Sequence, residues 1–259
     1  MTIRPAHQSV RPSPMFLIVV AVTAAGAVLA WLAQSSRTPL AYMGVFVFVI
    51  AGWIVSLCFH EFGHAFTAWR YGDHDIAVRG YLTLNPFKYA NPMLSLILPV
   101  LITLLGGIGL PGGAVWVRTS FMTDRQKTIV SLAGPFMNAV LAVLLLVATR
   151  LFYNPEHVVF WAAMAFLGFL QITGALLNLL PVPGLDGYGA LEPHLSPETR
   201  RALEPAKQWA FLIFLVLFIA TPLNRYFFAV VGWFFDLSGV NSGLIGLGFD
   251  LTRFWSAWL

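Results

Sequence analysis

The five residues His60-Glu61-Phe62-Gly63-His64 form the most specific chemical pattern in this chain. On a helix, the i, i+4 spacing places His60 and His64 on one face about one turn apart, so both imidazoles can bind one zinc ion. Glu61 is adjacent to the first histidine and could act as a general base on the attacking water without being a metal ligand. The pattern therefore predicts a helix that carries two metal ligands and a catalytic carboxylate.

A third ligand must come from elsewhere in the chain, because a catalytic zinc has three protein ligands and one open position. Asp186 is the best candidate, since it lies in "LNLLPVPGLDGYG", where Pro181 and Pro183 end a long apolar segment. The alternative for Asp186 is a turn or helix-capping residue. If two helices bring Asp186 to the two histidines, they form a His₂-carboxylate site for one Zn²⁺ ion per chain.

The other histidines are weaker candidates for the third ligand. His7 lies in the N-terminal tail, His157 is expected on the far side of the molecule, and His194 lies in a polar loop. His74 follows Gly72, where the helix is expected to have ended. The segment "GDHD" is therefore expected to form a solvated turn that does not contact the metal.

The composition indicates a membrane protein. Hydrophobic residues make up 58% of the 259 residues and charged residues only 10%, against about 25% charged in a typical soluble domain. The Lys and Arg residues are spread along the chain without an aromatic cluster, which excludes a nucleic-acid-binding groove. Cys58 is the only cysteine, so an intramolecular disulfide is impossible, and we expect a buried side chain.

The elements that must position these residues are membrane spans, each of which needs about 20 mainly apolar residues. Six segments qualify, at about 15–33, 41–70, 126–150, 157–180, 208–222 and 226–250. Between the second and third, "AVRGYLTLNP" alternates like short strands, and the Pro- and Gly-rich apolar stretch that follows fits a re-entrant loop. The predicted fold is an all-α polytopic membrane protein of about six transmembrane helices, with that loop and short β-strands, in a single domain over 1–259.

The distribution of basic residues predicts the orientation of these spans. With the N-terminus inside, only Arg37, Arg150 and Arg225 fall outside. Twelve fall on the inner side: Arg4, Arg11, Arg70, Arg79, Lys88, Arg118, Arg125, Lys127, Arg200, Arg201, Lys207 and Arg253. We therefore expect an integral protein of a bacterial plasma membrane, with both termini in the cytoplasm.

Three motifs in order resemble those of a known family. "HEFGH" in the second apolar segment, "LAGPFMN" in the third and "NLLPVPGLDG" at the end of the fourth are similar to motifs of the site-2 protease family of intramembrane zinc metalloproteases. "YLTLNPFKYANP" resembles the family's segment after the metal helix, and the similarity covers roughly residues 41–190. The resemblance implies hydrolysis of a peptide bond within or near the transmembrane segment of a membrane-protein substrate.

The resemblance also implies roles for individual residues. His60, His64 and Asp186 correspond to the zinc ligands, and Glu61 corresponds to the catalytic base. Asn178, eight residues before Asp186, matches a family asparagine that helps to polarise the scissile carbonyl. An interhelical hydrogen bond is the alternative for Asn178.

In "LAGPFMN", Gly134 and Asn138 match the family's Gly-x-x-x-Asn pattern, which we interpret as a site of close helix packing. An edge strand in "AVRGYLTL" could hold the unwound substrate by β-augmentation. The chain has no room for the PDZ or CBS domains of many relatives. It has Tyr89-Ala90-Asn91-Pro92 where compact relatives often have His-x-Asp-Pro, which leaves the role of this segment open.

Two other functions remain open at this point, a non-catalytic zinc-binding membrane protein and a metal transporter. A structural zinc site usually has four protein ligands, and a transporter needs polar residues along several spans. The sequence offers three good ligands and few polar residues within the spans. The expected partners are the lipid bilayer and a transmembrane or membrane-associated protein substrate, with no nucleic acid. The sequence does not identify a regulatory partner.

Overall fold

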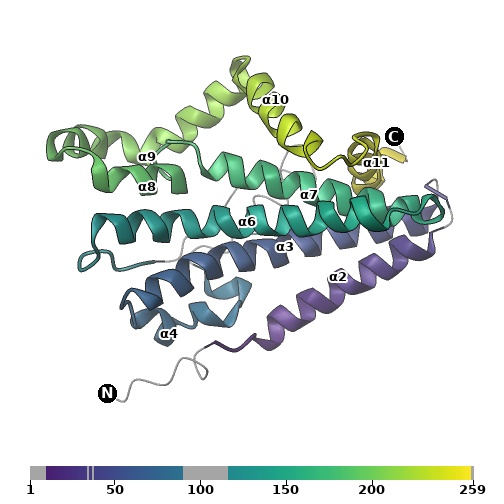
Figure 1. The fold of residues 1–259 in the computed structure, drawn as a ribbon, viewed down its shortest axis with the longest axis horizontal. Coiled ribbons are helices and arrows are strands. Elements are labelled where there is room, and N and C mark those ends of the chain that lie inside the picture. The colour runs from purple at the N-terminus through teal and green to yellow at the C-terminus, as the bar shows by residue number, and fades with distance from the viewer. Residues whose placement is uncertain (1–9, 34, 37, 90–115, 258–259) are drawn as a thin grey trace.

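The computed structural model describes residues 10–33, 35–36, 38–89 and 116–257 (Figure 1). Among these residues every regular element is a helix. The elements are α2 (Pro14–Leu32), α3 (Pro39–Arg70), α4 (Asp75–Arg79), η1 (Tyr81–Thr83), η2 (Pro86–Lys88), α6 (Asp124–Phe152), η4 (Pro155–His157), α7 (Val158–Asn178), α8 (Asp186–Leu191), η5 (Glu192–His194), α9 (Pro197–Ala220), α10 (Leu223–Asp236), α11 (Gly243–Thr252) and η6 (Phe254–Ala257).

Local sequence signals define where the long helices begin. The hydroxyl groups of Ser13 and Thr38 accept hydrogen bonds from the first turns of α2 and α3, and a proline follows each of them at the first helical position. At the start of α6, Thr123 and Gln126 form a reciprocal capping box. These caps satisfy N–H groups that a helix leaves free at its N-terminus.

Within the described residues, four helical segments are long and apolar enough to cross a membrane: Pro14–Leu32, Pro39–Arg70, Asp124–Phe152 and Pro155–Asn178. The helical membrane class is therefore confirmed, but the prediction of about six spans is wrong. The fifth predicted span corresponds to part of α9, which is bent by 59° between Pro197–Ala210 and Phe214–Ala220 and makes at most one more crossing.

The sixth predicted span is two short helices in the structure. The polar and Gly-rich residues between α10 and α11 end the first helix, and α11 has only 10 residues. At a rise of 1.5 Å per residue, α11 is about 15 Å long, roughly half the hydrocarbon thickness of a bilayer. The high proportion of apolar residues over 226–250 suggested one span, but the helix-breaking residues within this segment prevent a continuous helix.

The predicted short strands between the second and third spans are also wrong. The segment "AVRGYLTLNP" forms α4, η1 and the start of η2, and the described residues contain no strand. Gly80 and Leu84 have positive φ angles of 79° and 56°, which turn the backbone after each short helix. A substrate-binding strand edge is therefore not available here. The predicted re-entrant loop falls within 90–115, outside the described residues.

The core places α7 against the metal-motif helix α3, with α6 beside both. Ala163, Phe166 and Leu170 of α7 pack with Val45 and other buried side chains of α3. Figure 1 shows α3, α6 and α7 running side by side along the molecule. The most buried of the four candidate spans is the segment ending at Asn178, with 78% of its apolar window buried. The turn after α7 is thereby fixed relative to α3.

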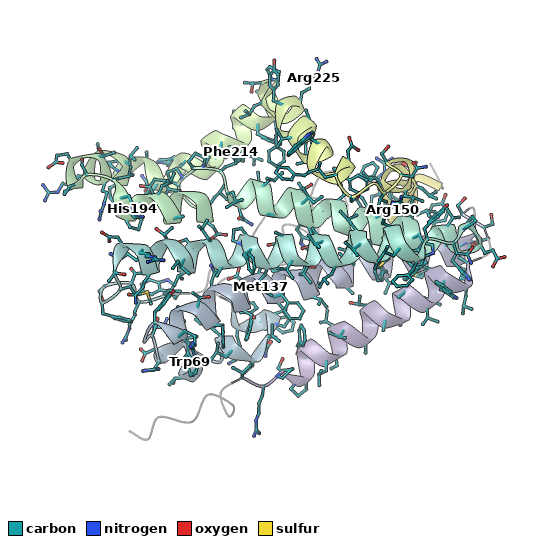
Figure 2. The ribbon with its side chains drawn as sticks, viewed as in Figure 1. Trp69, Met137, Arg150, His194, Phe214 and Arg225 are labelled. Carbon is teal, nitrogen blue, oxygen red and sulfur yellow. The ribbon has the colours of Figure 1, made fainter. Side chains whose placement is uncertain are left out.

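The two ends of the helix bundle differ in what they contain. Trp69 and His194 lie at one end and Arg150 at the other (Figure 2). At the first end, the N–H of Ser13, just before α2, donates to the carbonyl of Thr83 in η1. Helix α11 lies at the opposite end (Figure 1), and just after it the ring of Phe254 is 5.1 Å from that of Phe46.

Candidate metal centre

Three potential ligands from two separate segments converge inside the bundle. His60 and His64 lie on α3, and Asp186 is the first residue of α8, after the Pro-containing turn that ends α7. The Nε2 atoms of His60 and His64 are 3.2 and 3.3 Å from the two carboxylate oxygens of Asp186, and 3.1 Å from each other. One potential ligand atom from each residue lies within 4.8 Å of the others.

Helix α6 supplies the atoms that bond the other side of each imidazole. The Nδ1 of His64 lies 2.7 Å from the carbonyl oxygen of Val130, and the Nδ1 of His60 lies 2.5 Å from the Oδ1 of Asn138. Both partners are acceptors, so both Nδ1 atoms carry the proton. Both Nε2 atoms, which face Asp186, are therefore free to bind a metal.

Gly134 lies between these two partners, one helical turn from each, and directly faces the imidazoles. A Cβ atom at this position would be 2.6 Å from the Nε2 of His60 and would overlap the Nε2 of His64. The sequence prediction interpreted Gly134 and Asn138 as close helix packing. The structure adds that the two helices meet at the ligand atoms themselves, which explains why glycine is required there.

Glu61 and Asn178 line one small cavity beside the three potential ligands. This cavity has a volume of about 60 Å³, and its lining also includes His60, Asp186 and Gln171. The side chains of Glu61 and Asn178 are 2% and 6% exposed. The cavity is large enough for one or two waters. The two predicted catalytic residues and two of the three predicted ligands, His60 and Asp186, therefore lie around the same space.

A larger polar cavity of about 510 Å³ connects the site to the end of the bundle. Its lining runs from Glu61, His64 and Asp186 to Lys127 and Arg200. Gly184 and Leu185, in the turn after α7, also line this cavity. The cavity gives water a route to a site surrounded by apolar helices.

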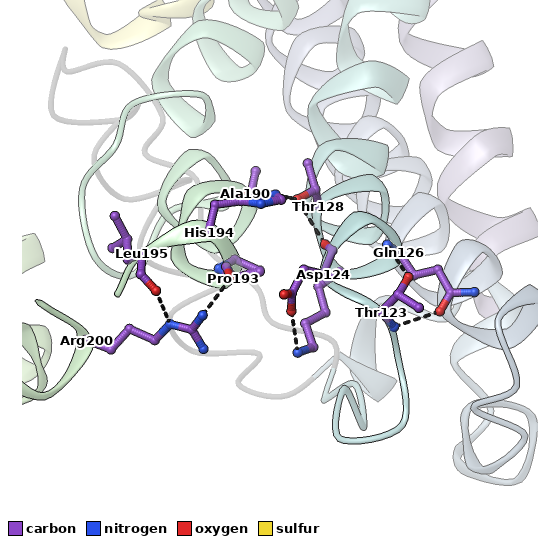
Figure 3. Close-up of polar contacts among 10 residues, drawn as sticks. Thr123, Asp124, Gln126, Thr128, Ala190, Pro193, His194, Leu195 and Arg200 are labelled. Atoms are coloured by element: carbon purple, nitrogen blue, oxygen red, sulfur yellow. Dashed lines mark hydrogen bonds and ion pairs between the residues drawn. The ribbon is translucent and has the colours of Figure 1, made fainter. Parts of the chain in front are cut away.

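Hydrogen bonds fix the outer rim of this cavity (Figure 3). Arg200 donates to the carbonyls of Pro193 and Leu195, which ties the start of α9 to η5. Thr128 of α6 donates to the carbonyl of Ala190 in α8. Because α8 begins at Asp186, these contacts hold the carboxylate segment against α6.

The other described candidate histidines lie away from the three ligands, and His7 lies outside the described residues. His157 stacks on Trp31 with ring centroids 3.6 Å apart, and His194 hydrogen-bonds Thr128. His74 lies at the start of α4, and among the described residues only His60, His64 and Asp186 form a possible metal group.

Two further side chains pack behind the metal helix. Cys58 is buried in the apolar cluster on the other side of α3, as expected. Tyr89, the only described residue of the divergent "YANP" segment, is 1% exposed, and its hydroxyl donates to the carbonyl of Cys58. Burial raises the pKa of Tyr89, so this hydroxyl stays a neutral donor. Tyr89 therefore supports the metal helix from behind.

The donor set fits zinc. Two imidazole Nε2 atoms and one carboxylate are the ligands of several catalytic zinc sites, and three protein ligands leave a coordination position open. The bonds from Val130 and Asn138 are the outer-shell contacts that orient histidines in such sites.

Comparison with known proteins finds relatives over the whole chain. The chain is 69% identical over 258 residues to "Putative zinc metalloprotease Rip2" of Mycolicibacterium smegmatis, which covers 100% of both chains. It is 65% identical over 252 residues, 97% of both chains, to the protein of the same name from Mycobacterium tuberculosis. It is 33% identical over 196 residues to "Putative zinc metalloprotease YwhC" of Bacillus subtilis, or 73% of this chain and 85% of that protein. No family model and no solved structure matches the chain.

The chain belongs to the site-2 protease family of intramembrane zinc metalloproteases. The family resemblance, the enzyme class and the zinc cofactor predicted from the sequence are thereby confirmed. Four apolar helices of spanning length confirm that this site-2 protease is a membrane protein. The roles of the individual site residues stay predictions.

Sequence reasoning missed Gln171, whose side chain hydrogen-bonds Asn138, which in turn hydrogen-bonds His60. Gln171 lies in α7, two helical turns before Asn178, and is completely buried. The available signal was an uncharged polar residue within an otherwise apolar span. Such residues in transmembrane helices commonly face the bundle interior and hydrogen-bond there.

Proposed function

We propose that this chain hydrolyses a peptide bond within or near the transmembrane segment of a membrane-protein substrate. His60, His64 and Asp186 would hold one zinc ion, and Glu61 would be the catalytic base. The observation that carries the proposal is the convergence of the three ligand atoms within 4.8 Å, beside the buried Glu61, in a chain 69% identical to a named zinc metalloprotease.

Each residue would have a separate role in the reaction. When bound, zinc polarises the substrate carbonyl and lowers the pKa of water to about 7. Glu61 would accept the proton of the attacking water and then donate it to the leaving amine. Asn178, at the C-terminal end of α7, would donate a hydrogen bond from its side-chain amide to the carbonyl oxygen as charge develops there.

The substrate must expose its backbone before it can react. A transmembrane helix has its carbonyls in i to i−4 hydrogen bonds, so the segment to be cleaved must unwind locally. A segment near a helix end, or one that contains Gly or Pro, unwinds most readily. We therefore propose membrane-embedded or membrane-associated polypeptides with such a segment as the substrate class.

A non-catalytic zinc protein and a metal transporter are the alternatives. A structural zinc site is usually closed by a fourth protein ligand, whereas the described residues supply three. A transporter would need ionisable residues along a pathway through the spans. The open coordination position and the adjacent buried carboxylate both favour hydrolysis.

A paired measurement tests the proposal. Wild type and Glu61→Gln are purified in detergent, zinc is counted per chain, and each is incubated with a panel of single-span substrates that carry a Gly or Pro near one helix end. We expect about one zinc per chain in both proteins and cleavage by wild type alone. Glu192→Gln, which changes a carboxylate on the rim of the same cavity, is the matched control and should cleave normally.

Two results would contradict the proposal. Zinc below about 0.1 per chain in wild type would exclude the ligand set, since chelating sites of this type retain zinc through purification. Equal cleavage by wild type and Glu61→Gln would exclude Glu61 as the base.

We also propose that the end of the bundle near the metal centre faces the cytoplasm, with the N-terminus on that side, and that residues 1–259 form one catalytic domain. The excess of Lys and Arg at that end supports this orientation. One observation opposes the prediction of a cytoplasmic C-terminus. Phe254, near the C-terminus, packs beside Phe46, near the start of α3, and this end of α3 is the one away from the metal centre.

Labelling of introduced cysteines tests the orientation without background, because Cys58 is buried. Both Arg125, in the first turn of α6, and Glu156, in η4 just after the other end of α6, are exposed. In intact cells a membrane-impermeant maleimide should react with Glu156→Cys and reach Arg125→Cys only after permeabilisation. The reverse pattern would overturn the proposed orientation.

A further inference from the structure

Behind His60, two buried amide side chains form a hydrogen-bonded chain that connects three helices. We propose that Asn138 and Gln171 are a positioning pair, which fixes the tautomer and ring orientation of His60 for metal binding. The inference rests on the proposed metal site and assigns a function to residues that the family assignment leaves without one.

The geometry of the chain is continuous from the metal centre to α7. The Nδ1 of His60 lies 2.5 Å from the Oδ1 of Asn138, and the Nδ2 of Asn138 donates to the Oε1 of Gln171 at 2.7 Å. The three side chains come from α3, α6 and α7 respectively. One hydrogen-bonded path therefore links the metal helix to the helix that leads to Asp186.

The amide of Asn138 can point in two directions, and only one of them permits metal binding. With Oδ1 toward His60, the proton stays on Nδ1 and Nε2 has a free lone pair. With the amide reversed, Nδ2 would donate to Nδ1, and the proton of the neutral ring would move to Nε2, which would block metal binding. The Oε1 of Gln171 accepts from the Nδ2 of Asn138 and so stabilises the first direction.

Both side chains of the pair are buried. Asn138 is 6% exposed and Gln171 is 0% exposed. Reversing the Asn138 amide alone would place its Oδ1 against the Oε1 of Gln171, two acceptors together, and a buried unsatisfied polar group costs about 1–3 kcal/mol.

The two histidines are positioned by different means. The Nδ1 of His64 donates to a backbone carbonyl, that of Val130, which no side-chain substitution removes directly. The Nδ1 of His60 depends on the Asn138 side chain and, through it, on Gln171. The inference therefore predicts that zinc binding is sensitive to substitutions at two residues that do not touch the metal.

The experiment measures the zinc dissociation constant of the full-length protein in detergent by competition with a chelator. The visible absorption spectrum after replacement of zinc by Co²⁺ reports the ligand geometry. Asn138→Leu keeps the volume and removes the acceptor, and Gln171→Leu removes the acceptor behind it. Thr149→Val in α6 and Thr173→Val in α7 are matched controls, because each removes a buried hydroxyl that bonds only within its own helix.

We expect Asn138→Leu to raise the zinc dissociation constant about 10- to 100-fold, the usual effect of losing an outer-shell partner, and to shift the Co²⁺ spectrum. Gln171→Leu should have a smaller effect in the same direction, and the two threonine controls should stay within about twofold of wild type. Asn138→Asp should restore binding, since a carboxylate accepts from Nδ1. The Nε2 of Gln171, which has no partner among the described residues, could then donate to the second carboxylate oxygen.

The inference is overturned if Asn138→Leu binds zinc like Thr149→Val, or if Asn138→Asp binds as weakly as Asn138→Leu while eluting as a folded protein. If Asn138→Leu does not fold, the comparison of Gln171→Leu with Thr173→Val decides, and equal dissociation constants would overturn the inference. Failure of the proposed function is distinguishable, because wild type itself would then hold no zinc.

Discussion

Replacing Gly134 with alanine tests whether α6 approaches the ligand atoms as closely as the structure indicates. The added Cβ would lie 2.6 Å from the Nε2 of His60 and would overlap the Nε2 of His64. Neither imidazole can turn aside freely, because each Nδ1 is hydrogen-bonded to α6 itself. The methyl group and the rings therefore compete for the same space.

The size of the effect follows from the cost of overpacking. Inserting a methyl group into a tightly packed interior costs about 1–3 kcal/mol. Since about 1.4 kcal/mol corresponds to a factor of ten in an equilibrium constant, the zinc dissociation constant should rise roughly 5- to 150-fold. Cleavage should fall by a similar factor when zinc is not saturating.

The assay compares Gly134→Ala with Gly232→Ala, a substitution in α10 where an added Cβ meets nothing within 4 Å. Both changes replace glycine by alanine in a helix, so both gain helix propensity equally. The zinc dissociation constant is measured by chelator competition, and the melting temperature of each zinc-free protein reports on the fold. Only Gly134→Ala should weaken zinc binding.

An unchanged zinc affinity in a folded Gly134→Ala protein would refute this reasoning. It would mean that α6 stands further from the imidazoles than the structure places it, or that the ligands can move without cost. A lower melting temperature with unchanged zinc affinity would have the same meaning, because the strain would then fall outside the ligand cluster.

Two further substitutions test the site and its support. Asn178→Ala should lower kcat about 10²- to 10³-fold with little change in KM or bound zinc, because it removes an oxyanion-stabilising donor. If Asn178 has a purely structural role, the substitution should instead lower stability and leave the turnover of the folded protein intact. Asp73→Ala should lower the free energy of unfolding by about 1.5–3 kcal/mol, because the buried carboxylate of Asp73 accepts a hydrogen bond from the backbone N–H of Arg118. Arg118→Ala removes only an exposed ion pair with Asp75 and should lower it by less than about 1 kcal/mol. Denaturant titration measures both changes. Equal effects of the last two substitutions would contradict the structural assignment.

The ligand trio could be predicted from the sequence because each part has a strong local signal. The spacing of His60 and His64 is meaningful on a helix, and the prolines before Asp186 mark the end of a span. The structure brings all three together, although their roles stay predictions until zinc is counted. The uses of Gly134 and Asn138 could not be predicted, because they depend on the register between two helices.

The short strands between the second and third spans were predicted wrongly, because the prediction used the apolar pattern without the backbone geometry. The alternation in "AVRGYLTL" is short, and the buried residues of this segment are Tyr81, Leu82 and Leu84. Since Tyr81 and Leu82 are adjacent in sequence, the burial does not follow a period of two. Gly80 turns the chain in the middle of the pattern. Hydrophobic alternation over so few residues is compatible with helical turns, so it did not determine a strand.

The position of the site along α3 explains how an apolar helix can carry Glu61 and two histidines. A charged residue at the centre of a membrane helix costs about 2.5–3.5 kcal/mol even on insertion scales. The 32 residues of α3 make a helix about 48 Å long, longer than the roughly 30 Å hydrocarbon layer, and His60 lies 10 residues before its end, about 15 Å away. The polar cavity covers that remaining distance from Glu61 to Arg200. The polar cavity therefore gives water access to a site on a long apolar helix, which hydrolysis requires.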